Sequence, residues 1–179
     1  MYVMRRATQG DIPALAELIH ARAHWMLQRG LDEGADLLTD DRANQIAAQA
    51  GDGLTPVWAL TDKTGALMGC TSLYDETPHW GWTDAERAEP AYFLATTFTH
   101  PARRQERPGT LIAWWAVDYA AREVRDWVRR GCGHQALVRY YRGVQGFELV
   151  HSTERHGHPA YLLARKAEEL PVLPVRTIE

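Results

Sequence analysis

The segment FTHPARRQERPGTL, residues 98–111, places three arginines, two prolines and one glycine between two apolar segments. A helix N-terminus carries unpaired N–H groups and a partial positive charge, so a helix that directly follows a strand favours phosphate. Gly109 would let a ligand approach the backbone, and the guanidinium groups of Arg103, Arg104 and Arg107 are strong phosphate donors. The segment therefore predicts a polyanion site, although a solvated basic turn would have the same composition.

Other phosphate-binding motifs are absent from the sequence. There is no GxxxxGK[ST] loop, and no GxGxxG follows a predicted strand, so neither a Walker loop nor a dinucleotide-binding fold is supported. The net charge is −3, from 20 basic and 23 acidic residues. Because the chain has no general positive field, we do not expect it to bind nucleic acid.

The cysteines and the N-terminal residues indicate a reduced compartment. Cys70 and Cys132 lack CxxC or metal-type spacing, the start MYVMRRATQGD lacks the apolar core of a signal peptide, and no run approaches a membrane span. We expect a cytoplasmic protein without a membrane partner. His20 and His24 have the i, i+4 spacing of zinc ligands, but no third ligand accompanies them, and we expect no metal.

Hydrophobic periodicity and turn residues predict the element order β-α-α-β-β-β-α-β-α-β-β. The strands are expected at residues 2–7, 57–62, 66–74, 91–99, 126–131, 146–153 and 159–166, and the helices at 8–29, 40–50, 110–125 and 135–143. Residues 30–40 and 75–90 are expected as loops. This order predicts an α/β fold with a mixed central sheet of about seven strands and helices on both faces. We expect a single domain over residues 1–169, followed by a tail, 170–179, that is an arm or disordered.

Two motifs resemble those of the GNAT superfamily of N-acetyltransferases. The family's acetyl-CoA motif, P–x–x–[RQ]–x–x–G–x–[GA] after a hydrophobic strand end, is matched by Phe98, Pro101, Arg104 and Gly109. The later stretch HQALVRYYRGVQGFELV is similar to the family's N…YY…GF element, with matching residues Tyr141, Gly146 and Phe147. The resemblance covers about residues 2–167 and implies the GNAT fold, most similar to small-molecule enzymes of an actinobacterial type.

The sequence departs from the family pattern at three places. Arg107 occupies the position of the motif's first glycine, and Pro108 then removes one backbone N–H from the turn. His134 replaces the family's asparagine, and one extra residue lies between Tyr141 and Gly146. The first departure implies that phosphate binding depends more on arginine side chains and less on backbone amides.

The resemblance implies acetyl-CoA as co-substrate. The strand before the turn would pair with the pantetheine arm, and the pyrophosphate would lie over residues 104–110. The implied coenzyme-binding residues are Thr97, Phe98, Thr99, Arg103, Arg104, Gln105, Arg107, Gly109, Thr110 and His134. Tyr141 matches the family's general acid, which protonates the leaving thiolate, with Tyr140 as the alternative; either could instead be a packing residue.

The general base and the acceptor site are less defined by the sequence. The predicted strand 91–99 contains no carboxylate, so Glu89 is our leading candidate for the base, with Asp75, Glu76 or a water chain as alternatives. Trp80 and Trp82, with Glu76, would shape an acceptor pocket and stack on a flat or cationic substrate, although both indoles could equally cap the core.

The sequence thus predicts an N-acetyltransferase that moves an acetyl group from acetyl-CoA to a primary amine of a small molecule by direct attack in a ternary complex. Two alternatives stay open. One is a non-catalytic GNAT-like module that binds CoA, a metabolite or a partner, and the other is an acetyltransferase of protein or peptide amines. Homodimer formation is also left open.

Overall fold

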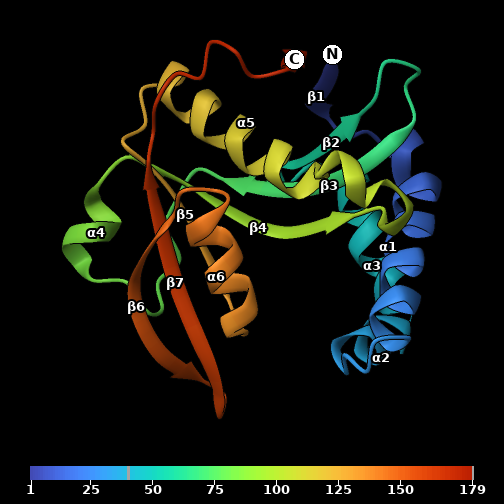
Figure 1. Cartoon of the computed structure of the whole chain (residues 1–179), viewed down its shortest axis with the longest axis horizontal. Helices are drawn as coiled ribbons and strands as arrows, with labels where there is room; N and C mark the ends of the chain where they lie inside the picture. Colours follow the sequence, from blue (N-terminus) through green and yellow to red (C-terminus); the bar gives the residue numbers. More distant parts are fainter. Residues whose placement is uncertain (40, 179) are drawn as a thin grey trace. The chain divides into compact units, whose positions relative to one another are not determined.

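The computed structural model describes residues 1–39 and 41–178. They form an eight-stranded mixed sheet in the order β6-β7-β5-β4-β3-β2-β1-β8 (Figure 1). The chain packs as two compact units: unit 1 is Met1–Ser72, Thr96–Ile112 and Pro174–Glu179, and unit 2 is Leu73–Ala95 and Ala113–Leu173. Strands β3 (Leu67–Tyr74) and β4 (Ala91–Thr99) and helix α5 (Pro108–Arg122) contribute to both units. The organisation of residues 1–169 as a single domain stays a prediction.

Unit 1 begins with a strand, a helical segment and a hairpin. Its further elements are β1 (Tyr2–Arg6), η1 (Gln9–Asp11), α1 (Ile12–Leu27), α2 (Glu33–Leu38), α3 (Arg42–Ala48), η2 (Gln49–Gly51) and β2 (Val57–Thr61). The helical segment starts where the sequence predicts it, because the Thr8 N–H donates to Asp11 Oδ2 at 2.8 Å. Strand β2 pairs antiparallel with both β1 and β3. The Gly65 N–H donates to the Asp62 carbonyl at 3.0 Å, which closes the predicted β2–β3 turn.

Helices cover both faces of β3 within unit 1, because neighbouring strand residues point to opposite sides. Cys70 packs in a core with residues of α1 and α3, among them Leu15 and Ala47. Its neighbour Gly69 faces the first turns of α5, where a Cβ on the glycine would lie 3.0 Å from Ile112 Cδ1. A larger residue at Gly69 would therefore push α5 away from the strand.

The C-terminal segment joins the sheet of unit 1. Residues Val175–Ile178 form β8, which pairs parallel with β1, and the Tyr2 N–H donates to the Pro174 carbonyl at 2.8 Å. The C-terminal segment consequently lies beside the N-terminal strand (Figure 1). Of the two forms expected for the tail, an arm or disordered chain, residues 175–178 are not disordered, because backbone pairing with β1 stabilises them and their short sequence does not reveal it.

Unit 2 contains a short helix, the larger part of α5 and the last strands. Its further elements are α4 (Asp84–Ala88), β5 (Trp127–Cys132), α6 (Gln135–Gly143), β6 (Glu148–Arg155) and β7 (His158–Lys166). Strand β4 pairs parallel with β5, and β7 pairs antiparallel with both β5 and β6. Adjacent β5 residues serve opposite faces: Arg129 packs against Trp82, and Arg130 packs against Tyr141.

Two segments expected as loops contain helices. Residues 30–40 include α2, whose Gly34 packs so closely on α1 that a Cβ there would lie 2.6 Å from the Ala23 carbonyl. Residues 75–90 include α4, which begins with a reciprocal capping box between Thr83 and Glu86. Helices of six and five residues show too little periodicity to be predicted, and their contacts stabilise them. The predicted helix over 40–50 is α3 followed by η2, and residue 40 lies outside the described residues.

Candidate functional site

Strand β4 changes its backbone geometry at Thr96. This residue has φ of 49°, the left-handed region that a β-branched residue rarely adopts, and such a residue is typical of a bulge. The parallel ladder with β5 covers Ala91–Phe93, before this position. Beyond it, Thr97 Oγ1 lies 2.8 Å from Thr71 Oγ1 of β3, and the His100 N–H donates to the Met68 carbonyl at 2.8 Å. Whether Thr97, Phe98 and Thr99 pair with pantetheine stays a prediction.

The turn that follows β4 is a six-residue 3-10 helix, η3 (Pro101–Glu106), joined to α5 by one residue. The His100 Nδ1 accepts from the Ala102 N–H at 3.2 Å and so caps its start. Arg107 has φ of 53° and ψ of 51°, the left-handed conformation in which glycine is favoured. The preference of the motif for glycine here has a conformational cause, and this chain adopts the same turn with an arginine.

Arg103 is held by acidic groups of unit 1. Its guanidinium donates to Glu106 Oε1 at 2.5 Å and to Asp62 Oδ2 at 2.8 Å, while the Tyr2 hydroxyl donates to Glu106 Oε2 at 3.2 Å. These hydrogen bonds, with Glu106 first and Asp62 second, raise the pKa of Arg103 above its usual range. Arg103 therefore ties the turn to the β2–β3 hairpin, and its charge is already neutralised by carboxylates.

Arg104 and Arg107 are placed differently. Both side chains are exposed, as is that of Gln105, and within residues 1–39 and 41–178 neither arginine forms an ion pair. At Gly109 an added Cβ would meet only Thr99 Cγ2, at 3.8 Å, so the backbone is open to close approach. The turn thus offers two available guanidinium groups beside an accessible backbone, which fits a diphosphate.

The first amides of α5 are partly used by the helix itself. The N–H groups of Thr110 and Leu111 both donate to the Arg107 carbonyl, at 2.9 and 3.1 Å, and Pro108 has no N–H. Thr110 is also 97% buried. An anion at this helix start would therefore depend mainly on guanidinium groups, as the departures from the family motif imply.

Tyr140 and Tyr141, the two predicted candidates for the general acid, lie on α6 of unit 2 next to a buried cation. The Arg130 Cζ lies 3.5 Å from the centroid of the half-buried Tyr141 ring and 5.5 Å from the centroid of the Phe147 ring. Tyr140 is more exposed, with its ring centroid 6.2 Å from that of Tyr141. His134 is the exposed N-cap residue of α6, and its carbonyl accepts from the amides of the first helical turn.

Glu89, the predicted base, is paired with a buried arginine. Arg129 is 2% exposed and donates to Glu89 Oε2, to the Glu86 carbonyl and to Thr77 Oγ1. Its guanidinium also lies 5.1 Å from the centroid of the buried Trp82 ring. Glu89 thus serves as a counterion of Arg129, and its role as general base stays a prediction.

A cavity of about 190 Å³ in unit 2 brings Glu89 and Trp82 together. It is lined by Trp82, Glu86, Glu89, Trp127, Arg129, Glu148, Val150 and Ala164. Glu86 is held by His151 Nε2 at 2.9 Å, whereas Glu148 is exposed and forms no ion pair among the described residues. Sequence reasoning missed Glu86, Glu148 and Arg129, which come from three separate segments of the chain with no common motif. Their convergence gives an acidic, indole-walled cavity.

The remaining predicted acceptor residues, Trp80 and Glu76, and the alternative base Asp75 lie outside this cavity. Trp80 stacks under Arg155 of β6, with 4.1 Å from the guanidinium carbon to the ring centroid. Glu76 is exposed, and Asp75 forms an ion pair with Arg125 at 2.7 Å. None of the three residues lines the unit 2 cavity.

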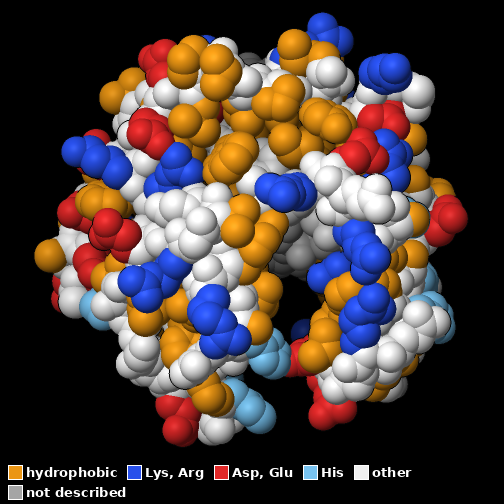
Figure 2. Space-filling view, in the orientation of Figure 1, with side chains coloured by type: hydrophobic (Ala, Val, Ile, Leu, Met, Phe, Trp, Pro, Cys, Tyr) orange, Lys and Arg blue, Asp and Glu red, His pale blue; other side chains and the backbone are white. Residues whose placement is uncertain are grey.

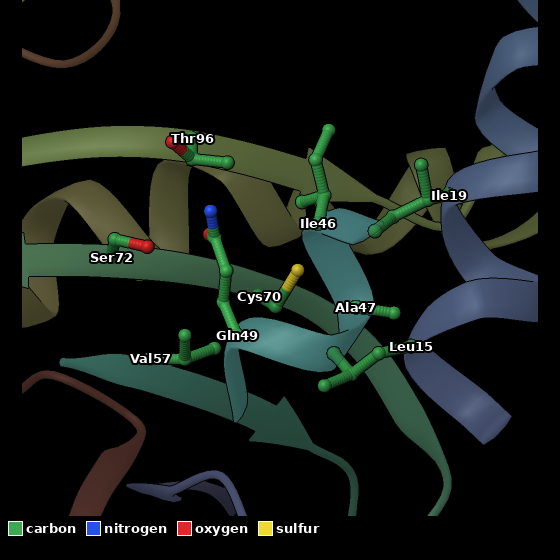
Figure 3. Close-up of a pocket in the computed structure, with 9 residues that line it drawn as sticks. All are labelled: Leu15, Ile19, Ile46, Ala47, Gln49, Val57, Cys70, Ser72 and Thr96. Carbon is green, nitrogen blue, oxygen red and sulfur yellow. The ribbon is translucent and has the colours of Figure 1, made fainter. Parts of the chain in front are cut away.

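A second, smaller pocket lies in unit 1 beneath β4. It is lined by Leu15, Ile19, Ile46, Ala47, Gln49, Val57, Cys70, Ser72 and Thr96, and Figure 3 shows the Gln49 side chain extending into it. Its volume of about 10 Å³ suffices for one water molecule at most. Burial raises the pKa of the Cys70 thiol to about 12, so this group is not a nucleophile at neutral pH.

The next observations concern a metal site and a membrane-spanning helix. His20 Nε2 lies 3.4 Å from Asn44 Oδ1, and no cluster of three potential metal ligands occurs in the described part of the chain. The longest described helix, α1, has 16 residues, and none in residues 1–39 and 41–178 meets the requirements of a bilayer span. On the face that Figure 2 shows, basic and acidic side chains are interspersed.

Comparison with known proteins gives matches only at the level of structure. No protein-family model matches this sequence, and no curated protein matches it significantly. A GNAT-family acetyltransferase from Listeria monocytogenes aligns with a TM-score of 0.71 at 18% identity, over 92% of this chain and 94% of that one. The structure of yncA from Salmonella typhimurium, with its cofactor acetyl-CoA, aligns at 0.56 with 20% identity over 96% and 97%. The ribosomal-protein-S18-alanine N-acetyltransferase from Escherichia coli aligns at 0.61 with 12% identity over 96% and 97%.

These alignments cover nearly the whole of this chain and of each compared chain. At identities of 20% or less they establish the fold and leave the activity to be argued from the site. The fold implied by the motifs around Gly109 and Tyr141 is confirmed: this chain has the fold of the GNAT superfamily of N-acetyltransferases.

Proposed function

We propose that this protein is an N-acetyltransferase that moves an acetyl group from acetyl-CoA to a primary amine of a small molecule. The observation that carries the proposal is the turn before α5, where Arg104 and Arg107 are exposed and without ion pairs among the described residues, beside the accessible backbone of Gly109. In a GNAT fold, this turn follows the strand that the motif predicts to hold the coenzyme.

The two free arginines would hold the coenzyme diphosphate. Arg103 would act differently, since Glu106 and Asp62 already bind it and it fixes the shape of the turn. Gly109 would admit the phosphates close to the backbone, and Thr97–Thr99 would supply strand-type hydrogen bonds to the pantetheine arm. Acetyl-CoA, when bound, supplies the thioester whose carbonyl carbon the amine attacks.

Tyr141 would donate its phenolic proton to the leaving thiolate, and a carboxylate or water would take a proton from the amine. Both proton transfers are needed, because the thiolate must be neutralised and an ammonium cannot attack. Glu89 already serves as the counterion of the buried Arg129, whose guanidinium donates to Glu89 Oε2. Glu148, exposed at the rim of the same cavity, is a carboxylate without such a partner among the described residues.

The unit 2 cavity has the lining of a site for a cation, on the face of β5 that carries Arg129, whereas Arg130 and Tyr141 lie on the opposite face. Three carboxylates and the indoles of Trp82 and Trp127 line it, against one positive charge on Arg129. Carboxylates and aromatic faces are the groups that bind ammonium ions. A volume of about 190 Å³ suits a small amine better than a folded protein surface.

A second function is favoured by specific observations. Glu89 is tied to Arg129, β4 carries no carboxylate, and Pro108 removes an amide from the phosphate turn. A non-catalytic module that binds CoA or a metabolite would keep the turn and lack an efficient base. A comparison of small amines with amine-bearing peptides as acceptors tests the alternative of a protein or peptide substrate.

Two measurements test the proposal. Acetyl-CoA should raise the melting temperature of the wild-type protein by mass action, and the Arg104→Ala/Arg107→Ala double variant should lose this shift. An Arg42→Ala variant, which removes an exposed arginine of α3, serves as the charge control. Thiol release with a panel of small amines and amine-bearing peptides then separates enzyme from binder. An unchanged shift in the double variant would overturn the coenzyme site.

A further inference from the structure

Arg130 is a buried cation that the proposed reaction has not used. It lies in the middle of β5 and is 5% exposed, and its Nη1 donates to Gln145 Oε1 at 2.8 Å. Its Nε has no hydrogen-bond partner, and the described residues provide no carboxylate in ion-pair contact with it. Burying an arginine without a counterion costs folding free energy, so this position suggests a role beyond packing.

The ring of Tyr141 is in contact with this charge. The Arg130 Cζ lies 3.5 Å from the ring centroid, which is a cation–π contact. The Phe147 ring centroid lies 5.5 Å from the same carbon, so two aromatic rings and no carboxylate adjoin the guanidinium among the described residues. This arrangement holds the phenol ring against a positive charge, which favours the negative charge that develops when the phenolic proton leaves.

Gln145 also contacts Arg130. It belongs to the segment between Tyr141 and Gly146, where this chain has one residue more than the family pattern. It is 1% exposed, its side chain accepts from Arg130, and its carbonyl accepts from Arg165 Nη1 at 2.6 Å. The following Gly146, with φ of 76°, lets the chain turn against Arg165, where a Cβ would lie 3.2 Å from Nη1. The lengthened helix exit thus buries an amide that orients Arg130.

We propose that Arg130 is a positioning residue for Tyr141, which holds the phenol in place and makes it a stronger acid by stabilising its phenolate. This proposal deepens the proposed transferase function and rests on it for the role of the proton. The donated proton moves from the Tyr141 oxygen to the thiolate sulfur, and Arg130 keeps its own protons throughout. Burial lowers the pKa of Arg130, yet a guanidinium stays protonated at physiological pH.

The other titratable groups near this pair are few. Tyr140 lies beside Tyr141 on α6, and Cys132 lies two residues beyond Arg130 on β5; both interact electrostatically with Arg130. Arg165 of β7 reaches the pair only through Gln145. His134 begins α6, and its carbonyl is the acceptor for the Cys132 thiol at 3.8 Å. Among the described contacts, the carboxylate of this group is Glu168, which pairs with Arg165 and not with Arg130.

The test measures the ionisation midpoint of the Tyr141 phenol directly, by NMR titration of protein labelled at tyrosine Cζ, with the signal assigned from Tyr141→Phe. In Arg130→Gln, which keeps a polar group and removes the charge, we expect the midpoint to rise by about one pH unit or more. Arg130→Lys should restore much of the wild-type value. Arg165→Met, which removes a neighbouring cation outside the ring contact, is the control and should shift the midpoint far less.

Kinetics give the second readout. In Arg130→Gln, kcat should fall, and the alkaline limb of its pH profile should move to higher pH together with the phenol midpoint. In a Tyr141→Phe background, Arg130→Gln should have no further effect on kcat. A folded Arg130→Gln protein with an unchanged phenol midpoint overturns the proposal. Because the titration needs no substrate, this failure is distinct from failure of the transferase function, which would appear as absent coenzyme binding or thiol release. If Arg130→Gln does not fold, Arg130→Met, a neutral side chain of similar length, replaces it in the same titration, and an unchanged midpoint in that variant overturns the proposal.

Discussion

Asp62, in the turn between β2 and β3, accepts a hydrogen bond at 2.8 Å from Arg103, in the turn between β4 and α5. The two residues are 41 positions apart, and Glu106 binds the same guanidinium. Hydrogen bonds from Thr64 and then from Arg103 hold the pKa of Asp62 well below its usual range. One of the three arginines of the turn is therefore structural, and this division of roles leads to the first prediction.

Arg103→Ala should lower the melting temperature by several degrees, because Asp62 and Glu106 lose their shared cation. The acetyl-CoA-induced shift should persist in this variant, although weaker. Arg104→Ala should behave in the opposite way, with unchanged stability and a reduced shift. Differential scanning fluorimetry with and without coenzyme measures both quantities, and equal behaviour of the two variants would contradict the division.

Arg107→Gly should stabilise the protein relative to Arg107→Ala by about 1 kcal/mol, because φ of 53° favours glycine. Both variants remove the same charge, so both should lose the same coenzyme affinity. Urea unfolding at pH 7 gives the stability difference. A glycine variant no more stable than the alanine variant would show that Arg107 does not hold this conformation in solution.

Asp11→Asn should destabilise the protein by about 1 kcal/mol at pH 7, since it removes the ion pair with Arg5 and half of the capping box. Hydrogen bonds from Arg5, followed by those from Thr8, lower the pKa of Asp11 to about 2. A lowered folded-state pKa means that this stability is present above about pH 4 and is lost as the pH falls toward 2. Unfolding of wild type and variant at pH 7 and at pH 2.5 should therefore show a difference that is clearly smaller at the lower pH.

Glu89→Gln should cost about 2 kcal/mol of unfolding free energy, because Arg129, at 2% exposure, loses its charged partner. Glu148→Gln, at the exposed rim of the same cavity, is the matched control and should leave stability unchanged. If Glu89 is also the general base, its variant should lose kcat beyond what thermal inactivation explains, with the loss independent of pH. Chemical unfolding and initial rates below the melting transition separate the two effects.

Cys70 should resist alkylation in the native protein, because it is fully buried and burial raises the pKa of its thiol to about 12. Cys132 is partly exposed and should react first, slowly, since burial also raises its pKa. Ellman's reagent should count one thiol per native chain and two after unfolding. Rapid reaction of both thiols without denaturant would mean that the core around Cys70 opens in solution.

The sequence by itself determined the local elements and the fold class. The predicted helix over 8–29 contains η1 and α1, and the predicted strands 57–62, 66–74 and 91–99 correspond to β2, β3 and β4. These features depend on backbone preferences and periodicity within about ten residues, which the sequence shows directly. The two motifs then implied the GNAT fold, and the structural comparisons confirm it.

Only the tertiary structure decided which charges are available for chemistry. Arg103 and Glu89 are as prominent in the sequence as Arg104 and Glu148, yet partners 41 and 40 residues away occupy the first two. The tertiary structure likewise decided that residues 175–178 form β8 and that Arg130 lies beneath Tyr141. Coulombic and cross-strand contacts depend on distance in space, and distance in space between residues far apart in sequence is set by the packing of the whole sheet.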